Sequence, residues 1–145
     1  MSTGIRVILS FVIGWFLAQG TKLVIFMIRV KGRVTFKDVV EMMMKSGGMP
    51  SGHSASMSAA VGTIGFFEGF GSVLFALGAC MLIIVVYDAI NVRYAVGEQG
   101  KALNKLGEKE TEWKHLKVVE GHTILQVIVG IVIGIAVAAV MNCVR

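Results

Sequence analysis

The sequence has little charge, one proline and two cysteines, and these shortages exclude several classes of protein. Charged residues make up 16% of the chain and hydrophobic residues 55%, whereas an ordinary soluble domain carries about 25% charged residues. Cys80 and Cys143 have no partner at metal-ligand spacing, and no HxxxH pair or acidic cluster stands elsewhere. The composition therefore argues against a soluble domain, a disulfide scaffold and a zinc site, and we expect neither a metal nor a cofactor.

Long apolar runs dominate the chain instead. A helix needs about 20 predominantly apolar residues to cross a bilayer, and runs approaching this length cover residues 5–28, 53–70, 72–91 and 122–143. A length of 145 residues is typical of one domain. We therefore predict a single membrane-embedded domain over residues 1–145, all-α and polytopic, with about four transmembrane helices.

Two mixed segments separate these runs. The segment after Arg29 combines charges with Val, Phe and Met, which predicts a short amphipathic helix at the membrane interface. Residues 94–120 form a longer polar segment, in which we expect Gly97, Gly100 and Gly107 to act as breakers between two short helices.

The spans, if they alternate in direction, place their polar ends on one side of the membrane. That side also carries 12 of the 14 Lys and Arg residues, all except Arg6 and Arg145. By the positive-inside rule this face is cytoplasmic, and both termini lie outside. The side chains gathered there are Lys22, Arg29, His53, Asp88, Arg93 and His122.

The loop from Ser46 to Ser54 holds the only proline together with paired glycines, serines and a histidine. Ser51 and Gly52 offer hydroxyl and backbone donors at the start of a helix, where free N–H groups favour an anion. Three cations, Lys22, Arg29 and Arg93, would repel one another around one pocket unless an anion such as phosphate joined them.

Two imidazoles add reactivity to this predicted site. His53 and His122 both titrate near neutral pH, so one can attack phosphorus while the other protonates the leaving oxygen. Lys and Arg can neutralise the charge of the transition state without a metal ion.

The motifs that carry these residues resemble a known superfamily. Pro50-Ser51-Gly52-His53-Ser54 is similar to the second signature of the type 2 phosphatidic acid phosphatases and vanadium haloperoxidases. The whole chain resembles the divergent, compact branch of that superfamily, through ordered pieces that match at residues 18–22, 47–55, 88–93, 97–99, 103–104, 121–123 and 126–127.

The resemblance implies a role for each residue. His122 would be the nucleophile that forms a phosphohistidine, and His53 would be the general acid. Lys22, Arg29 and Arg93 would bind phosphate, with the donors of Ser51 and Gly52.

The sequence departs from the superfamily pattern at three positions. Val30 replaces a proline, Val92 replaces a serine, and Gln126 stands where the carboxylate partner of the nucleophile is expected. Gln126 can orient His122 but cannot stabilise an imidazolium as a carboxylate does. Asp88 or Glu120 could supply that charge, and Asp88 could equally form a structural salt bridge with Arg93 or Lys22.

These observations predict an integral-membrane phosphatase for a lipid or isoprenoid phosphate, inhibited by vanadate. The alternative is a non-catalytic lipid-phosphate-binding membrane protein, which Gln126 would allow. We expect the membrane, and no nucleic acid, as a partner. Small-residue stripes at Ala55–Thr63 and Gly130–Ala138 also suggest a homo-oligomer.

Overall fold

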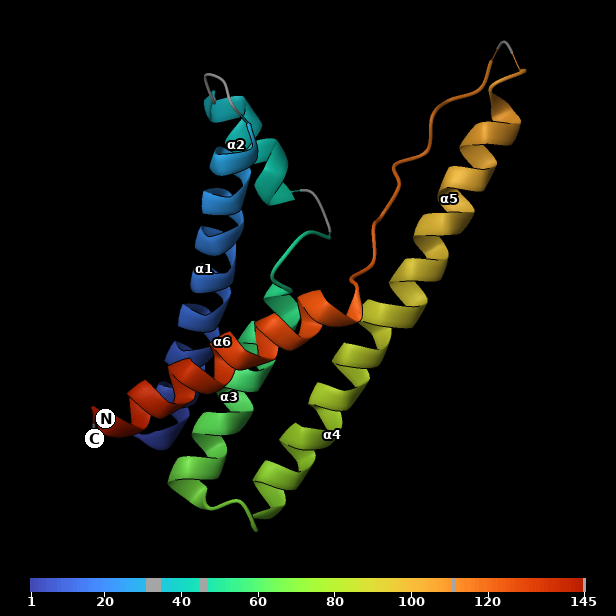
Figure 1. Cartoon of the computed structure of the whole chain (residues 1–145). Helices are drawn as coiled ribbons and strands as arrows, with labels where there is room; N and C mark the ends of the chain where they lie inside the picture. The colour runs from blue at the N-terminus through green and yellow to red at the C-terminus, as the bar shows by residue number, and fades with distance from the viewer. Residues whose placement is uncertain (31–34, 45–46, 111, 145) are drawn as a thin grey trace.

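The chain is all-helical over the residues that the computed structural model describes, which are 1–30, 35–44, 47–110 and 112–144. No strand occurs within these ranges, so the predicted fold class is confirmed. The helices, shown in Figure 1, are α1 (Thr3–Arg29), α2 (Phe36–Met44), α3 (Gly52–Glu68), α4 (Val73–Tyr87), the π-helical turn η1 (Asp88–Val92), α5 (Arg93–Gly107) and α6 (Ile124–Cys143).

Three of the helical segments are long and apolar enough to cross a membrane. They are α1, the continuous helix Val73–Gly107, and α6. The span expected at residues 53–70 is α3, whose 17 residues extend about 26 Å at 1.5 Å per residue. It is the shortest of the four and lies between α1 and α6 (Figure 1). The chain is thus a polytopic membrane protein.

Small side chains form the contact between α3 and its two neighbours. Ala55 and Ala59 are fully buried, and a Cβ added to Gly14 of α1 would lie 2.8 Å from the Ala55 carbonyl oxygen. A Cβ added to Gly134 of α6 would collide with the same oxygen. Because lipid is as apolar as leucine, helices in a membrane associate by close backbone approach rather than by burying large apolar groups.

Polar groups inside this contact are satisfied locally. The hydroxyl oxygens of Ser10 and Thr63 lie 2.8 Å apart and join α1 to α3. The Ser58 hydroxyl donates to the Ser54 carbonyl at 2.6 Å and lies 3.3 Å from the Ile131 carbonyl of α6. Because the hydrocarbon core holds no water, a hydroxyl buried there needs a partner within the protein, and these hydroxyls have one.

Both small-residue stripes predicted from the sequence are used within one chain. Gly130 and Gly134 of α6 approach the backbone of α3 at Ser51 and Ala55, and Gly62 of α3 faces Ala138 of α6. The stripes therefore no longer argue for a second copy of the chain, and the homo-oligomer stays a prediction without this support.

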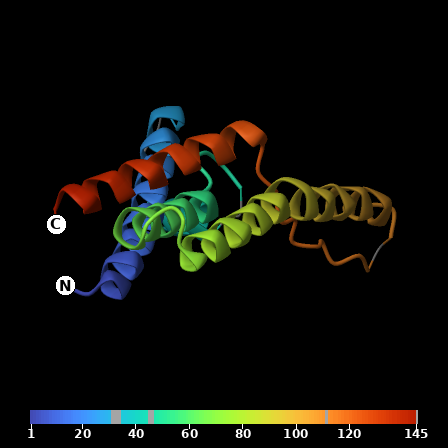
Figure 2. The ribbon, with the colours of Figure 1, turned by 90° about the horizontal axis from the view of Figure 1, so that it is seen from below.

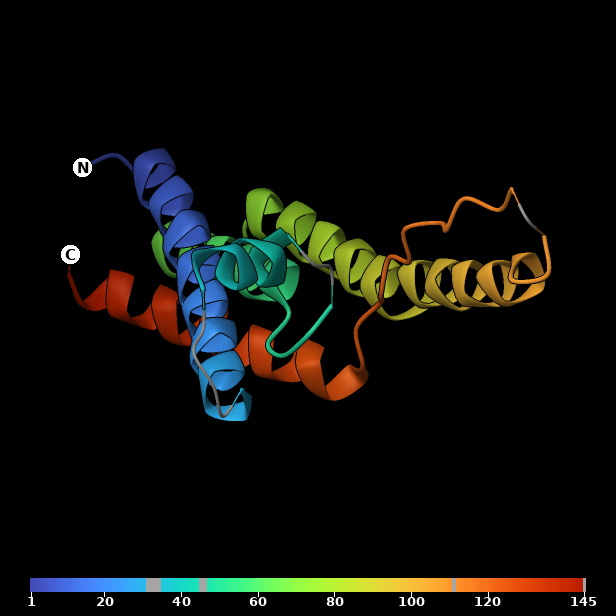
Figure 3. The ribbon, with the colours of Figure 1, turned by 90° about the horizontal axis from the view of Figure 1, so that it is seen from above.

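The polar segment 94–120 differs from the expectation of two short helices. Gly97 and Gly100 do not break the chain, because α5 runs through them to Gly107. Residues 114–123 form no helix and run back along α5. Figures 2 and 3 show from opposite sides that α5 and this returning segment project away from α1, α3 and α6.

The glycines of α5 are required by the segment that returns over them. A Cβ on Gly97 would lie 2.7 Å from the Val119 carbonyl oxygen, and a Cβ on Gly107 would overlap the Trp113 ring. Between these points the side chain of Asn104 forms two hydrogen bonds with the backbone of the returning segment. Its amide nitrogen donates to the Leu116 carbonyl at 2.9 Å, and its amide oxygen accepts from the Leu116 N–H at 2.8 Å.

We predict that Gly134→Ala destabilises the protein by about 1–3 kcal/mol, because its Cβ forces α6 away from α3. The matched control is Gly4→Ala on α1, where no atom lies within 4 Å of the added Cβ. Gly4 is the second residue of α1, so its replacement should leave the stability unchanged or raise it slightly. Unfolding in detergent, followed by circular dichroism, measures both, and equal stability of the two variants would contradict the packing described here.

Candidate active site

Charged and imidazole side chains from α1, the start of α3, the π-helical turn with the start of α5, and the residues just before α6 come together in one cluster. His53, at the start of α3, interacts electrostatically with Arg93, Lys22 and Asp88. His122, just before α6, interacts in the same way with Lys22 and His53. His53 therefore lies within electrostatic range of four other residues that the sequence placed on the same membrane face, which are Lys22, Asp88, Arg93 and His122.

His122 is held by its backbone and by its ring. Its N–H donates to the Ala89 carbonyl in the π-helical turn η1 at 2.9 Å. Its Nδ1 lies 3.1 Å from Oε1 of Gln126, and only 5% of the residue is exposed. An amide oxygen can only accept, so Nδ1 carries the proton and, in the neutral ring, Nε2 carries the lone pair.

Gln126, which orients the His122 ring, is itself held in place by hydrogen bonds at the start of α6. Its Oε1 also accepts from the Thr123 N–H at 3.1 Å, and the Thr123 hydroxyl accepts from the Gln126 N–H, which is the capping box that begins α6. The Gln126 carbonyl accepts from the Ser51 N–H at 2.9 Å and so ties the loop before α3 to α6.

Burial is the main influence on the charge state of His122, which precedes the spanning helix α6. It lowers the pKa of the imidazole below the ordinary value of 6.5, and the positive charges of Lys22 and His53 add to this effect. The hydrogen bonds to Gln126 and to the backbone of Gly48 oppose it. His122 is therefore neutral at pH 7, as a nucleophile must be.

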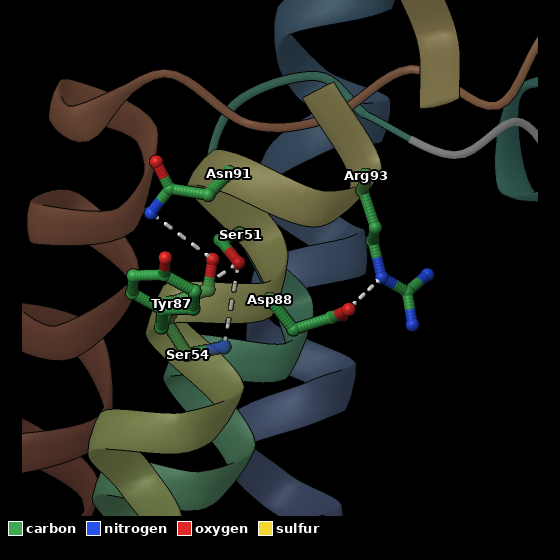
Figure 4. Close-up of polar contacts among 6 residues, drawn as sticks. All are labelled: Ser51, Ser54, Tyr87, Asp88, Asn91 and Arg93. Atoms are coloured by element: carbon green, nitrogen blue, oxygen red, sulfur yellow. Dashed lines mark hydrogen bonds and ion pairs between the residues drawn. The ribbon is translucent and has the colours of Figure 1, made fainter. Parts of the chain in front are cut away.

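The π-helical turn aligns Asp88 with Arg93 (Figure 4). In an α-helix residues five apart point about 140° away from each other, whereas the i to i+5 register of a π turn places them on one side. The Arg93 Nε donates to Asp88 Oδ2 at 2.6 Å. Of the two roles considered for Asp88, the structure shows the salt bridge with Arg93.

This pairing leaves part of the guanidinium available. Figure 4 shows the two terminal nitrogens of Arg93 directed away from Asp88, and the arginine side chain is 37% exposed. A planar guanidinium that is held through Nε can still present both terminal nitrogens to a phosphate.

Ser51 has a structural role at the start of α3. It is fully buried, and its Oγ caps the helix by accepting from the Ser54 N–H at 3.3 Å. The Ser54 hydroxyl lies 2.9 Å from the same oxygen (Figure 4). Since the first N–H groups of a helix have no acceptor within it, those of Gly52 and His53 are the donors that this helix start offers an anion.

Arg29 stands apart from the cluster. It is the last residue of α1 and is exposed. The helix continues without a kink-forming proline, so the seven residues after Lys22 carry Arg29 about 10 Å further along the axis. Among the described residues no hydrogen bond or ion pair joins it to His53 or His122, and its phosphate-binding role stays a prediction.

Gln19 is a candidate site residue to which the sequence gave no role. Its Oε1 is buried without a hydrogen-bond partner among the described residues, and its Nε2 would lie 3.9 Å from a Cβ on Gly52. An unpaired buried amide oxygen beside a helix start is a position where a substrate or water would complete a hydrogen bond. The signal in the sequence was its position three residues before Lys22, on the same helix face.

A polar pocket of about 190 Å³ opens beside His122. Glu98 and Lys101 of α5, which form a 2.8 Å ion pair, line it together with Glu120 and Gln126. No three His, Cys, Asp or Glu side chains gather as a metal site would require, within the part of the chain that the structure describes. The charged side chains in the lining of this pocket are Glu98, Lys101 and Glu120, whereas Lys22, His53 and Arg93 are not among its lining residues.

Comparison with known proteins gives one family and one relative. A family model described as "Divergent PAP2 family" matches residues 4–137. The chain is 34% identical over 113 residues to the uncharacterized membrane protein YuiD of Bacillus subtilis (strain 168). The aligned region covers 66% of this chain and 71% of that protein. No solved structure matches the chain.

We predict that His122 titrates below pH 6.5 and that Gln126→Asp raises its pKa by about one unit or more, because a carboxylate stabilises the imidazolium. Histidine NMR in detergent measures both values, with the exposed His115 as the internal control. A pKa of 6.5 or higher for His122 in the unaltered protein would contradict the buried, amide-bonded ring.

Proposed function

The chain belongs to the divergent PAP2 family, and from this premise we propose that it is an integral-membrane phosphatase for lipid or isoprenoid phosphates. The observation that carries the proposal is the arrangement of two imidazoles. His122 has its Nδ1 3.1 Å from an amide oxygen and interacts electrostatically with His53 and Lys22. A neutral, oriented histidine beside a second histidine and fixed cations suits phosphoryl transfer.

In the first step Nε2 of His122 attacks phosphorus, a P–N bond forms, and the P–O bond to the alcohol breaks. His53, in its protonated form, gives its proton to the leaving oxygen. Lys22, the terminal nitrogens of Arg93 and the N–H groups of Gly52 and His53 neutralise the charge on the remaining phosphoryl oxygens.

In the second step water attacks the phosphohistidine. His53, now neutral, accepts a proton from the water, a P–O bond forms, the P–N bond breaks, and inorganic phosphate leaves. Asp88 contributes through Arg93 rather than through His122, because it fixes the Nε of the guanidinium. Gln126 keeps the proton of His122 on Nδ1 in both steps.

A second function is favoured by Gln126. An amide cannot stabilise the cationic ring that forms when Nε2 of His122 attacks phosphorus, as a carboxylate would. A non-catalytic protein that binds lipid phosphate through the same cations would tolerate this residue. The two functions differ in whether phosphate is released.

We predict that the purified protein in detergent releases phosphate from an isoprenoid or lipid phosphate without added metal, and that vanadate inhibits the release. His122→Ala should lower the rate by about a thousandfold or more, because it removes the nucleophile. His115→Ala is the matched control and should keep full activity, since it replaces an exposed histidine of the returning segment. Full activity of His122→Ala would disprove the nucleophile assignment.

We also propose that the site faces the cytoplasm. The termini lie at the end of the helix cluster away from the site (Figure 1), where Arg6 donates to the Val144 carbonyl at 3.2 Å. The excess of Lys and Arg at the opposite end then directs that end inward and both termini outward.

This orientation predicts opposite labelling of two introduced cysteines in a background in which Cys80 and Cys143 are replaced by alanine. A membrane-impermeant maleimide should label Ser2→Cys in intact cells, and should label Lys117→Cys only after permeabilisation. The reverse pattern would place the site outside the cell.

A further inference from the structure

The amide oxygen of Gln19 is an exception among the buried polar groups of this protein. The hydroxyls buried in the helix contacts all have partners, which is true of Ser10, Ser54, Ser58 and Thr63. Of the buried side-chain nitrogen and oxygen atoms in the described part of the chain, Oε1 of Gln19 is the one without a hydrogen-bond partner. A buried acceptor without a partner costs free energy, so its presence calls for an explanation.

Gln19 lies where α1 passes the start of α3. Its Nε2 and the indole Nε1 of Trp15 would each lie 3.9 Å from a Cβ added to Gly52. Lys22 follows Gln19 by three residues on the same face of α1 and interacts electrostatically with His53. The Gln19 amide therefore lies beside the residue that precedes His53, just as the Gln126 amide lies beside His122.

The chemistry of an amide oxygen limits what it can bind, because it accepts hydrogen bonds and donates none. At pH 7 the oxygens of a phosphate monoester are mostly deprotonated and are acceptors themselves. Gln19 Oε1 therefore has nothing to accept from the phosphoryl group. The partner that fits it is a molecule with an O–H group, next to His53.

The second step of the proposed reaction brings such a molecule to this place. His53 protonates the leaving oxygen in the first step and accepts a proton from water in the second, so the water occupies the position that the leaving oxygen vacates. Water has a second O–H group that needs an acceptor. Lys22 offers only donors, and the Asp88 carboxylate is bound to Arg93. The terminal torsion of a glutamine is broad, so a rotation of the Gln19 amide turns Oε1 toward the start of α3.

We propose that Gln19 is a catalytic residue of the second step, in which it binds the water that hydrolyses the phosphohistidine. The inference rests on the proposed phosphatase function and makes its hydrolytic step more specific. The water gives one proton to His53 and hydrogen-bonds through the other to Oε1 of Gln19, which directs a lone pair of the water oxygen at phosphorus. As the P–O bond forms, the P–N bond breaks and its electron pair returns to Nε2 of His122. Gln19 neither gains nor loses a proton.

The test replaces Gln19 by Met, which has nearly the same length and no amide. The matched control is Gln99→Met, the same change at an exposed position of α5. Each variant is mixed with farnesyl phosphate in detergent and quenched within milliseconds. The appearance of farnesol measures formation of the phosphohistidine, and the appearance of inorganic phosphate measures its breakdown. Unfolding in detergent, followed by circular dichroism, measures stability.

We predict that Gln19→Met slows phosphate release about a hundredfold, because the water is no longer aligned with phosphorus. The first burst of farnesol should keep its rate within about twofold, so phosphohistidine should accumulate. The stability should stay the same or rise, because an apolar side chain replaces an unpaired oxygen. Gln99→Met should match the unaltered protein in all three measurements.

Unchanged phosphate release in Gln19→Met would overturn the role of Gln19 in hydrolysis. Equal slowing of both steps, with or without a loss of stability, would also overturn it and make Gln19 a structural residue. These outcomes leave the phosphatase proposal standing. If the unaltered protein gives neither a burst of farnesol nor a phosphohistidine, the phosphatase proposal itself fails and the role of Gln19 fails with it.

Discussion

The close approach of α3 to its two neighbours is the constraint on which the rest of the structure depends. Most of the residues that α3 buries are alanine, serine, threonine or glycine, so the backbones of α1 and α6 come within contact distance of it at Gly14 and Gly134. This contact fixes where α3 and α6 begin. Their starting residues supply the Ser51–Gln126 backbone bond, the free N–H groups of α3, and His122.

The second constraint is the path of the chain between α4 and α6. The π-helical turn at Asp88–Val92 does two things at once: it aligns Asp88 with Arg93, and its Ala89 carbonyl holds the backbone of His122. The returning segment reaches that carbonyl only by lying against the glycines of α5, where Asn104 binds it through Leu116. Residues far from the reacting atoms therefore determine where His122 stands.

Hydropathy and spacing were enough to predict the all-α membrane fold and to place Lys22, His53, Arg93 and His122 on one face, because span ends are visible in a sequence. Other features depend on contacts that a single sequence does not encode. A π turn leaves no compositional mark, so the partner of Asp88 could not be chosen among His122, Arg93 and Lys22. Gly97 and Gly100 were expected to break a helix because the segment that packs on them was not known. The spacing from Lys22 to Arg29 matched the superfamily signature, but a straight α1 carries Arg29 away from the cluster.

The central claim is that these constraints make His122 a nucleophile, and the most direct measurement is the position of a trapped phosphoryl group. The protein is mixed with an isoprenoid phosphate, quenched in alkali within milliseconds to preserve phosphohistidine, digested, and analysed by mass spectrometry. The account predicts a phosphoryl group on His122, and its accumulation when His53→Asn slows breakdown. A phosphoryl group on His53 or on another residue, or none at any time during turnover, would contradict it.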